Sequence, residues 1–267
     1  MSVRLIHITS LWLIANGIRY SHDNHHLSDS YAISGKEKAS CLKCGETNKW
    51  NNIFGELECK NCGYKVNENN HIGSKDFDLI KRVGFKMKHE SVLEHSLIVL
   101  EIEASRALLQ ELSRHRIGIS PTIKSTRYTL KELKKEKPFT IYDYVDKDFY
   151  KYDEVIRASK YVIFTNDVYV DLQIIESLEK VRFLINLHKS NDIAKYALPE
   201  AFKLKGQYSF NLRSLVHLLE LRTNRDVLPE FQQLCVNIID ALPDDYKELI
   251  LTNEKIKVNY ERIKKHF

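Results

Sequence analysis

The chain has 267 residues, of which 43% are hydrophobic and 29% are charged. This balance predicts a globular protein with a sizeable core, built as one large domain or as one domain with an insert. The formal net charge of +5 is too small to indicate a dedicated nucleic-acid-binding protein, but it suits a pocket that collects phosphates.

No segment has the pattern of a membrane span or of a secretion signal. The most apolar early run, residues 11–15, is far shorter than the ~20 residues that a bilayer requires. The N-terminus lacks a charged region followed by a long apolar stretch. We therefore expect a soluble cytoplasmic protein without a membrane partner.

The N-terminal segment predicts one strand and two helices. The pattern of residues 1–20 predicts a short strand and then a helix, with Ser10 as the helix cap. Residues 21–40 are polar. The apolar spacing of residues 76–87 predicts the second helix.

The middle of the chain predicts a capping box, a strand and a helix. Ser91 and Glu94 have the spacing of a capping box. The branched residues of 97–102 predict a buried strand, and residues 105–115 predict a helix. Pro121 is expected to break that helix into a loop.

The rest of the chain is dominated by helical periodicity. Helices are predicted within 150–188, where the apolar runs are 155–164 and 178–188, and at 194–202, 209–221 and 228–242. No internal repeat or low-complexity tract is evident. Many helices with few strands predict an α+β fold.

A cationic motif lies where the predicted helix of 105–115 runs out into a loop. Arg114, His115 and Arg116 are adjacent there. Adjacent helical residues point about 100° apart, so these side chains would reach several anionic groups, or groups on different subunits. Arg suits phosphate because its donors form a fixed fork. Alone, however, the motif is more often a solvated basic helix end, where the helix dipole favours cations.

The longer string from Arg114 to Tyr128 resembles the signature of flavin-dependent thymidylate synthases. In that signature RHR is followed by seven residues and then by Ser-x-Arg, usually with Tyr next; here eight residues separate Arg116 from Ser125. Further segments resemble family elements in the family's order, namely KHESVLEH (88–95), DIAKYALPE (192–200) and FNLRSLVHLLELR (210–222), with IRYS (18–21) as a weaker match. Together they cover most of the chain outside a cysteine-rich module.

The resemblance implies a fold, an activity and an assembly. The fold is that of flavin-dependent thymidylate synthases, helix-rich around a small sheet and spanning residues 1–267. The activity converts dUMP to dTMP, with methylenetetrahydrofolate as carbon donor and NADPH as reductant through FAD. The assembly is a homotetramer whose active sites form between subunits.

The resemblance also assigns functional roles to particular residues. The FAD-binding positions match Ser21, Ser91, Glu94, Arg114, His115, Arg116, Asn211 and Arg213, and positions near the flavin match His89 and His217. The dUMP-binding positions match Glu111, Ser125, Thr126, Arg127, Lys195 and Arg222. Arg222 is expected to polarise the uracil ring by stabilising negative charge that develops on the pyrimidine.

Each match has a plainer structural interpretation as well. Ser91 and Glu94 could simply form a capping box, and Asn211 could be a plain N-cap. The remaining three, Arg213, Arg222 and Lys195, could be surface charges. Their assignment to a functional site therefore rests on their occurring together, in the order of the family's motifs.

Four of the five cysteines form two CxxC pairs. The pairs are separated by fourteen residues and consist of Cys41, Cys44, Cys59 and Cys62. Four thiolates can close a tetrahedral shell, so we predict a structural zinc site in an inserted ribbon-like module at 37–68. Two disulfides are the alternative. A second metal site at His22, His25 and His26 is a weaker hypothesis than solvated loop histidines.

The fifth cysteine, Cys235, lies in an apolar helical pattern that is typical of a buried and inert thiol. The other kind of thymidylate synthase attacks dUMP with a cysteine, so the absence of a plausible nucleophile fits the flavin route.

Two other functions remain open from the sequence. One is a related enzyme that modifies dUMP differently, for example by hydroxymethylation. The other is a zinc-ribbon nucleic-acid-binding protein on a degenerate synthase scaffold, against which the modest charge argues.

Overall fold

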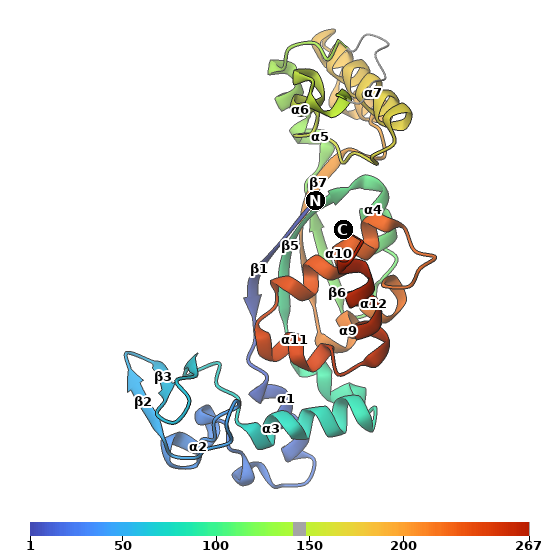
Figure 1. Cartoon of the computed structure of the whole chain (residues 1–267). Helices are drawn as coiled ribbons and strands as arrows, with labels where there is room; N and C mark the ends of the chain where they lie inside the picture. Colours follow the sequence, from blue (N-terminus) through green and yellow to red (C-terminus); the bar gives the residue numbers. More distant parts are fainter. Residues whose placement is uncertain (141–147, 267) are drawn as a thin grey trace. The chain divides into compact units, whose positions relative to one another are not determined.

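The computed structural model describes residues 1–140 and 148–266 and is drawn in Figure 1. The chain divides into two compact units. The first comprises residues 1–3, 101–115 and 121–207, and the second comprises residues 4–100, 116–120 and 208–267. The predicted α+β class is confirmed, because helices dominate and the strands form two small sheets.

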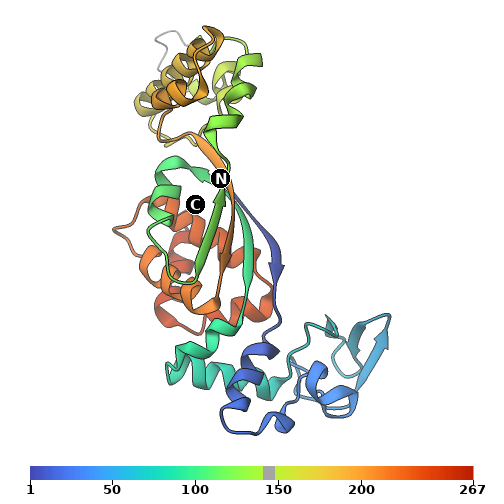
Figure 2. The ribbon, with the colours of Figure 1, turned by 180° about the vertical axis from the view of Figure 1, so that it is seen from behind.

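The larger sheet has four strands in the order β1-β5-β7-β6. Their bounds are Ser2–Ile8 for β1, Ile98–Ser105 for β5, Ile119–Ile123 for β6 and Lys203–Phe210 for β7. The strands lie side by side in both views (Figures 1 and 2). Strands β1 and β5 were predicted from their residue patterns, whereas β6 and β7 were not.

Pro121 does not end a helix, which corrects the prediction made from its residue type. Helix α4 (Arg106–Leu112) ends nine residues earlier, and Pro121 lies within β6. Strand β6 is at the end of the sheet order. An edge strand tolerates proline because one of its sides needs no ladder hydrogen bonds.

The second unit contains seven α-helices among the described residues. Their bounds are Trp12–Tyr20 (α1), Tyr31–Lys38 (α2), Ser74–Ile80 (α3), Leu212–Arg222 (α9), Pro229–Ala241 (α10), Asp244–Ile250 (α11) and Glu254–Lys264 (α12). The unit also has 3-10 helices at His25–Leu27 (η1) and Glu90–His95 (η3) and a π-helix at Lys81–Lys86 (η2). Helix α10 starts with proline at its first position, where the missing N–H costs no hydrogen bond. It buries Phe231, Leu234 and Cys235 in the core.

Two predicted caps are wrong. The hydroxyl of Ser10 makes no hydrogen bond to another described residue, and α1 has Leu11 at its N-cap without a side-chain bond. Ser91 and Glu94 both lie inside the 3-10 helix η3, whose N-cap is His89. A capping box needs Ser at the N-cap, so that prediction does not hold.

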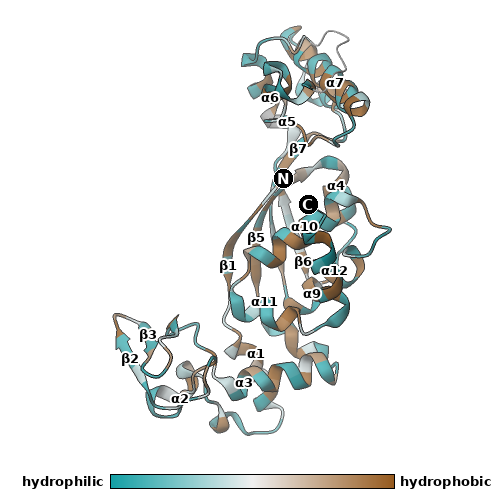
Figure 3. Cartoon of the chain, viewed as in Figure 1, coloured by the Kyte–Doolittle hydropathy of each residue, from teal (hydrophilic) through white to brown (hydrophobic). Residues whose placement is uncertain are grey.

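The first unit is built around helix α7 (Val168–Asn186). The other helical segments are α4, α5 (Thr126–Thr129), η4 (Leu130–Lys135), η5 (Phe149–Lys151), α6 (Asp153–Ala158), α8 (Asn191–Ala194) and η6 (Lys195–Ala197). Hydrophobic and hydrophilic residues alternate along α7 (Figure 3). Its residues Ile175, Leu178 and Val181 are fully buried, so one face of the helix supplies the core of this unit.

Three predicted helices have other bounds. The run 155–164 is helical only to Ala158, after which Val162 pairs with Phe202 in a β-bridge. The helix predicted at 194–202 stops at Ala197. The one predicted at 209–221 starts at Leu212, because Ser209 and Phe210 complete β7. In each case strand pairing replaces the helix that local periodicity favoured.

The cysteine-rich module forms the smaller sheet. Strands β2 (Trp50–Ile53), β3 (Glu56–Cys59) and β4 (Lys65–Asn67) pair antiparallel in that order. Its core consists of five buried residues, which are Ala39, Cys41, Trp50, Leu57 and Cys59. Among residues 1–140 and 148–266, no helix is both long and apolar enough to cross a membrane.

Asp171 ties the start of α7 to the preceding loop, and its removal is expected to destabilise the first unit. Its fully buried carboxylate accepts hydrogen bonds from the Tyr150 hydroxyl at 2.7 Å and from the Thr165 amide at 2.8 Å. Asp171→Ala leaves these donors unpaired and should lower the free energy of unfolding by about 3 kcal/mol. Asp153→Ala, which removes an exposed ion pair with Arg157, should cost less than about 1 kcal/mol. Equal losses in denaturant melts of the two variants would contradict this account.

Candidate functional site

The N-terminus of α9 joins three segments that are distant in sequence. Asn211 is the N-cap, and its side-chain oxygen accepts from the Ser214 amide at 2.8 Å. The Leu212 amide donates to the Ser96 hydroxyl at 2.8 Å. The Asn211 amide donates to the Gly118 carbonyl at 3.2 Å. Asn211 is therefore an N-cap, which is compatible with a further role toward a ligand.

Gly118 fits this junction because it has no side chain. Its φ is +66°, in the left-handed region that favours glycine. A Cβ atom there would overlap the Ser214 hydroxyl and the Asn211 side chain. Gly118 was not among the predicted site residues, although a glycine two residues after the cationic motif is a visible signal in the sequence.

Arg213 and Glu94, two predicted site residues, are in direct contact. The Arg213 Nη1 atom lies 2.6 Å from Glu94 Oε1, and its Nε atom lies 3.6 Å from Glu90 Oε2. All three side chains are about half exposed. Ser91 lies in η3 between these two carboxylates along the chain, and His89 is the residue before η3.

His217 lies one helical turn after Arg213 and is exposed. Both residues line a small recess of about 50 Å³, together with Gly84, Leu93 and other residues of η2 and η3. The structure thus brings Glu94, Arg213 and His217 to one surface of the second unit.

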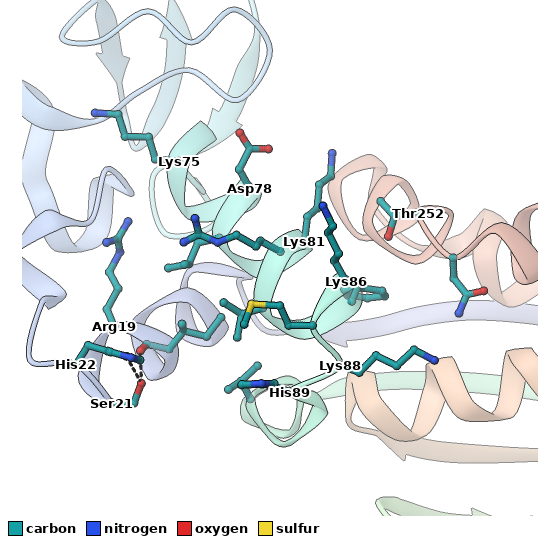
Figure 4. Close-up of a pocket in the computed structure, with 18 of the residues that line it drawn as sticks. Arg19, Ser21, His22, Lys75, Asp78, Lys81, Lys86, Lys88, His89 and Thr252 are labelled. Carbon is teal, nitrogen blue, oxygen red and sulfur yellow. Dashed lines mark hydrogen bonds between the residues drawn. The ribbon is translucent and has the colours of Figure 1, made fainter.

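A larger open groove of about 1750 Å³ lies in the same unit and includes the predicted residues Ser21 and His89. Figure 4 shows Lys81, Lys86 and Lys88 around it. Lysines from α3, from η2 and from the segment before η3 line the groove, namely Lys75, Lys81, Lys86 and Lys88. The groove is therefore rich in cations and suits an anionic ligand.

These lysines belong to none of the motifs that predicted site residues. In the segment 76–87 only the apolar spacing led to a prediction, that of a helix. The backbone there is unusual, because η2 is a π-helix and Lys88 has a φ of +56°. Both features are found preferentially at functional sites.

The first unit brings together a second set of predicted residues. Arg127 Nε lies 3.2 Å from Asp192 Oδ1, and Lys195 Nζ lies 3.9 Å from the same oxygen. The Asn191 side chain donates to the Arg127 carbonyl at 2.8 Å. The Ser125 hydroxyl accepts from the Arg127 amide and caps α5, beside Thr126. Two cations thus share one carboxylate on the surface of the first unit.

The RHR motif is divided between the two units. Arg114 and His115 belong to the first unit and Arg116 to the second. Arg114 Nη1 lies 3.5 Å from Glu111 Oε1, which is a second contact between predicted residues. Arg114 and Arg116 are exposed.

Arg222 is at the last position of α9. Its guanidinium lies over the Phe231 ring, with 4.8 Å between the guanidinium carbon and the ring centroid. A cation over an aromatic face is attracted by the ring, so this contact helps to hold the Arg222 guanidinium in place. Cys235 is fully buried, and burial raises the pKa of its thiol, so it is not a nucleophile.

The four clustered cysteines come together as predicted. Their sulfur atoms all lie within 4.8 Å of one another. Cys41 Sγ lies 3.6 Å from Cys62 Sγ, and Cys44 Sγ lies 3.7 Å from Cys59 Sγ. A disulfide requires about 2.05 Å, so the alternative of two disulfides is wrong. A hydrogen bond from Asn61 lowers the pKa of Cys44 to about 6, whereas burial raises the pKa of Cys41.

The three histidines of the loop after α1 do not form a metal site. Among the described residues, the four cysteines are the one group of metal-ligating side chains with suitable geometry. His25 instead stacks on Tyr20, with ring centroids 5.1 Å apart.

The chain is similar in sequence to a known protein family. The family described as "Thymidylate synthase complementing protein" matches residues 33–244. A flavin-dependent thymidylate synthase of Wolinella succinogenes is 39% identical over 197 residues, which cover 73% of this chain and 91% of the relative. Another, from Helicobacter pylori strain J99, is 42% identical over 179 residues, which cover 66% of this chain and 82% of the relative.

A solved structure supports the same assignment. The crystal structure of thymidylate synthase X from Helicobacter pylori with FAD and dUMP aligns with a TM-score of 0.73 and 32% identity, covering 96% of this chain and 99% of that one. The chain therefore belongs to the flavin-dependent thymidylate synthase family, and the family predicted from the sequence is confirmed.

Gly118→Ala is expected to destabilise the second unit more than a matched glycine substitution. Gly55, in the turn between β2 and β3, also has a positive φ, +83°, but a Cβ there would lie 3.6 Å from its nearest neighbour, Glu68 Oε1, which is ordinary contact. Gly55→Ala should therefore cost mainly the backbone strain of about 1 kcal/mol. Gly118→Ala should add about 2 kcal/mol for the overlap with Asn211 and Ser214. The two melting temperatures test this, and a Gly118→Ala protein as stable as Gly55→Ala would disprove the packing argument.

Proposed function

We propose that the chain methylates dUMP to dTMP, with methylenetetrahydrofolate as carbon donor and NADPH as reductant through bound FAD. Membership of the family supports this proposal, as does the presence of FAD and dUMP in the related Helicobacter pylori structure. The observation that carries it is the surface at the start of α9. There Arg213, Glu94 and His217 converge beside Gly118 and Asn211.

FAD is proposed to bind along this surface. When bound, it supplies the hydride-transfer chemistry that no side chain offers. Arg213 would exchange its carboxylate partners for a phosphate, at low cost because exposed ion pairs contribute only about 0–1 kcal/mol. The other residues assigned to the cofactor are Ser21, His89, Ser91, Arg114, His115, Arg116 and Asn211.

The dUMP phosphate is proposed to bind where Arg127 and Lys195 share Asp192, with Ser125 and Thr126 adding hydroxyl groups. Glu111 is assigned to the nucleotide as well. Arg222, held by Phe231, would stabilise negative charge on the uracil ring as the pyrimidine becomes reactive.

We also propose a homotetramer in the cytoplasm, with active sites shared between subunits. The assigned residues are mostly half-exposed to fully exposed in one chain, so a partner surface is needed to exclude water from the reaction. The catalytic domain would span 1–267, with 37–68 as the inserted module. A reducing compartment agrees with the five free thiols.

The decisive experiment is a flavin spectrum combined with a dUMP-dependent assay of NADPH oxidation. We expect a yellow protein that oxidises NADPH faster with dUMP and folate present, and a product with the mass of dTMP. A colourless protein that takes up no added FAD would overturn the proposal. A hydroxymethylated product would replace methylation by the related modification.

Arg222→Ala should lower kcat/KM for dUMP by about 100-fold, because a donor to a developing charge is lost from the transition state. Arg225→Ala is the matched control, since Arg225 is exposed in the loop that follows α9. It should stay within about twofold of wild type. Initial rates at varied dUMP provide the measurement. Similar losses in both variants would remove Arg222 from its catalytic role.

Arg213→Ala should weaken FAD binding by about tenfold, which corresponds to the loss of one charge-assisted contact of roughly 1.4 kcal/mol. Lys257→Ala, which removes an exposed cation of α12 that lies 3.9 Å from Glu254, should leave the affinity unchanged. Flavin fluorescence titration of the apoprotein measures both. If Arg213→Ala binds FAD as tightly as wild type, Arg213 does not contact an FAD phosphate.

A further inference from the structure

We propose that the four cysteines bind a structural zinc ion, and that this ion braces one wall of the cation-rich groove through a chain of buried hydrogen bonds. The brace consists of Ser40, Asp29 and helix α3. It gives the inserted module a role that the proposed reaction does not itself define.

The sulfur geometry fits zinc. A tetrahedral ion with zinc–sulfur bonds of about 2.3 Å places neighbouring sulfur atoms roughly 3.8 Å apart. The two short sulfur–sulfur distances, 3.6 and 3.7 Å, agree with this value. Each distance joins one CxxC pair to the other, so one ion would cross-link both ends of the module.

The two CxxC turns have the same backbone design. The Gly45 amide donates to the Cys41 carbonyl at 2.8 Å, and the Gly63 amide donates to the Cys59 carbonyl at 2.9 Å. Both glycines have a positive φ, +72° and +73°. This repeated turn directs both sulfur atoms of each CxxC pair to one point. Isolated surface thiols would not need such a turn.

The module is too small to hold itself together by burial alone. Its core has five buried residues, two of which are the ligands Cys41 and Cys59. Folded units below about 40 residues usually need a metal or disulfides, and no disulfide joins the described cysteines. Metal binding then contributes directly to folding.

Ser40, the residue before Cys41, connects the ion to the rest of the unit. Its hydroxyl, fully buried, donates to the Asp29 carboxylate and accepts from the Ser74 amide at 2.9 Å. Its carbonyl accepts from His71 Nε2 at 3.0 Å. His71 Nδ1 accepts from the Tyr31 amide, so the other ring nitrogen carries the proton. Burial lowers the pKa of His71 to about 4, which keeps this ring neutral.

Asp29 passes the connection to α3. Its buried carboxylate accepts from the Lys75 amide at 2.8 Å and from the Asp76 amide at 3.0 Å, which are free amides of the first turn of the helix. A carboxylate is well placed there because it also meets the positive end of the helix dipole. Gly73 makes this approach possible, since a Cβ would overlap Asp29.

Asp76 completes the path to the groove. It is fully buried and accepts from Arg19 Nε at 2.6 Å, from Ser28 at 2.5 Å and from Ser30 at 2.7 Å. Arg19, Lys75 and Asp78 line the groove with Ser21, as Figure 4 shows. Loss of the ion would release Ser40, leave Asp29 with one partner fewer and loosen the start of α3.

The test combines metal analysis with hydrogen exchange on the intact chain. Wild type and Cys235→Ala should each contain about one zinc per chain, because Cys235 lies outside the cluster, and Cys62→Ser should contain far less. Zinc-free wild type, or a Cys62→Ser protein with full zinc, would overturn the site.

Hydrogen exchange at Lys75 and Asp76 tests the brace. Their amides should exchange about tenfold faster or more in Cys62→Ser, whereas the amides of α10 should be unchanged. Ser40→Ala should keep its zinc and show the same local acceleration, and it decides the matter if Cys62→Ser does not fold. If these two amides exchange in Ser40→Ala at the same rate as in wild type, the proposed brace is wrong. Neither measurement requires flavin or turnover, so failure of the proposed reaction would leave both results interpretable.

Discussion

The close packing of Gly118 against the first turn of α9 is the constraint on which the candidate flavin surface depends. The Gly118 carbonyl and the Ser96 hydroxyl accept consecutive backbone amides, those of Asn211 and Leu212. Three segments more than twenty residues apart in sequence are thereby fixed to one point. Arg213, the next residue, is then directed to Glu94. The Ser96 bond keeps Glu94, two residues earlier in the chain, beside the start of α9.

Several cations of the candidate site form ion pairs with carboxylates. Arg213 contacts Glu90 and Glu94, and Arg127 shares Asp192 with Lys195. These pairs are partly exposed, so each contributes only about 0–1 kcal/mol. That is enough to orient a long side chain and too little to prevent a phosphate from displacing the carboxylate.

Buried hydrogen bonds and carboxylates connect the cysteine-rich module to α3. Asp29 and Asp76 are both buried, and their oxygens are used by backbone amides, hydroxyls and Arg19. Buried carboxylates are stable only when paired in this way. Such a junction is specific in geometry, because each oxygen has a defined partner. It also depends on Ser40, and therefore on whatever holds the adjacent Cys41.

The sequence by itself determined the family, the four cysteines and the type of most elements, because these follow from ordered motifs and from periodicity. The segments β1, β5 and α10 are confirmed, and Arg213 and Glu94 were selected by the same motifs. The elements that sequence periodicity predicted wrongly are those whose structure depends on contacts with distant parts of the chain. Pro121 is in a strand because the edge of a sheet accepts it, and residues 203–210 form β7 because β5 and β6 pair with it.

Only the tertiary structure decided which charged side chains lie close to one another. The carboxylates Asp29 and Asp76 carried no signal in the sequence, yet they connect the module to α3. The lysines of 81–88 were visible as charges, but their gathering around one groove depends on a π-helical turn. Hydrogen bonds and ion pairs act over a few ångströms in space, and sequence spacing fixes such distances only within a single helix or turn.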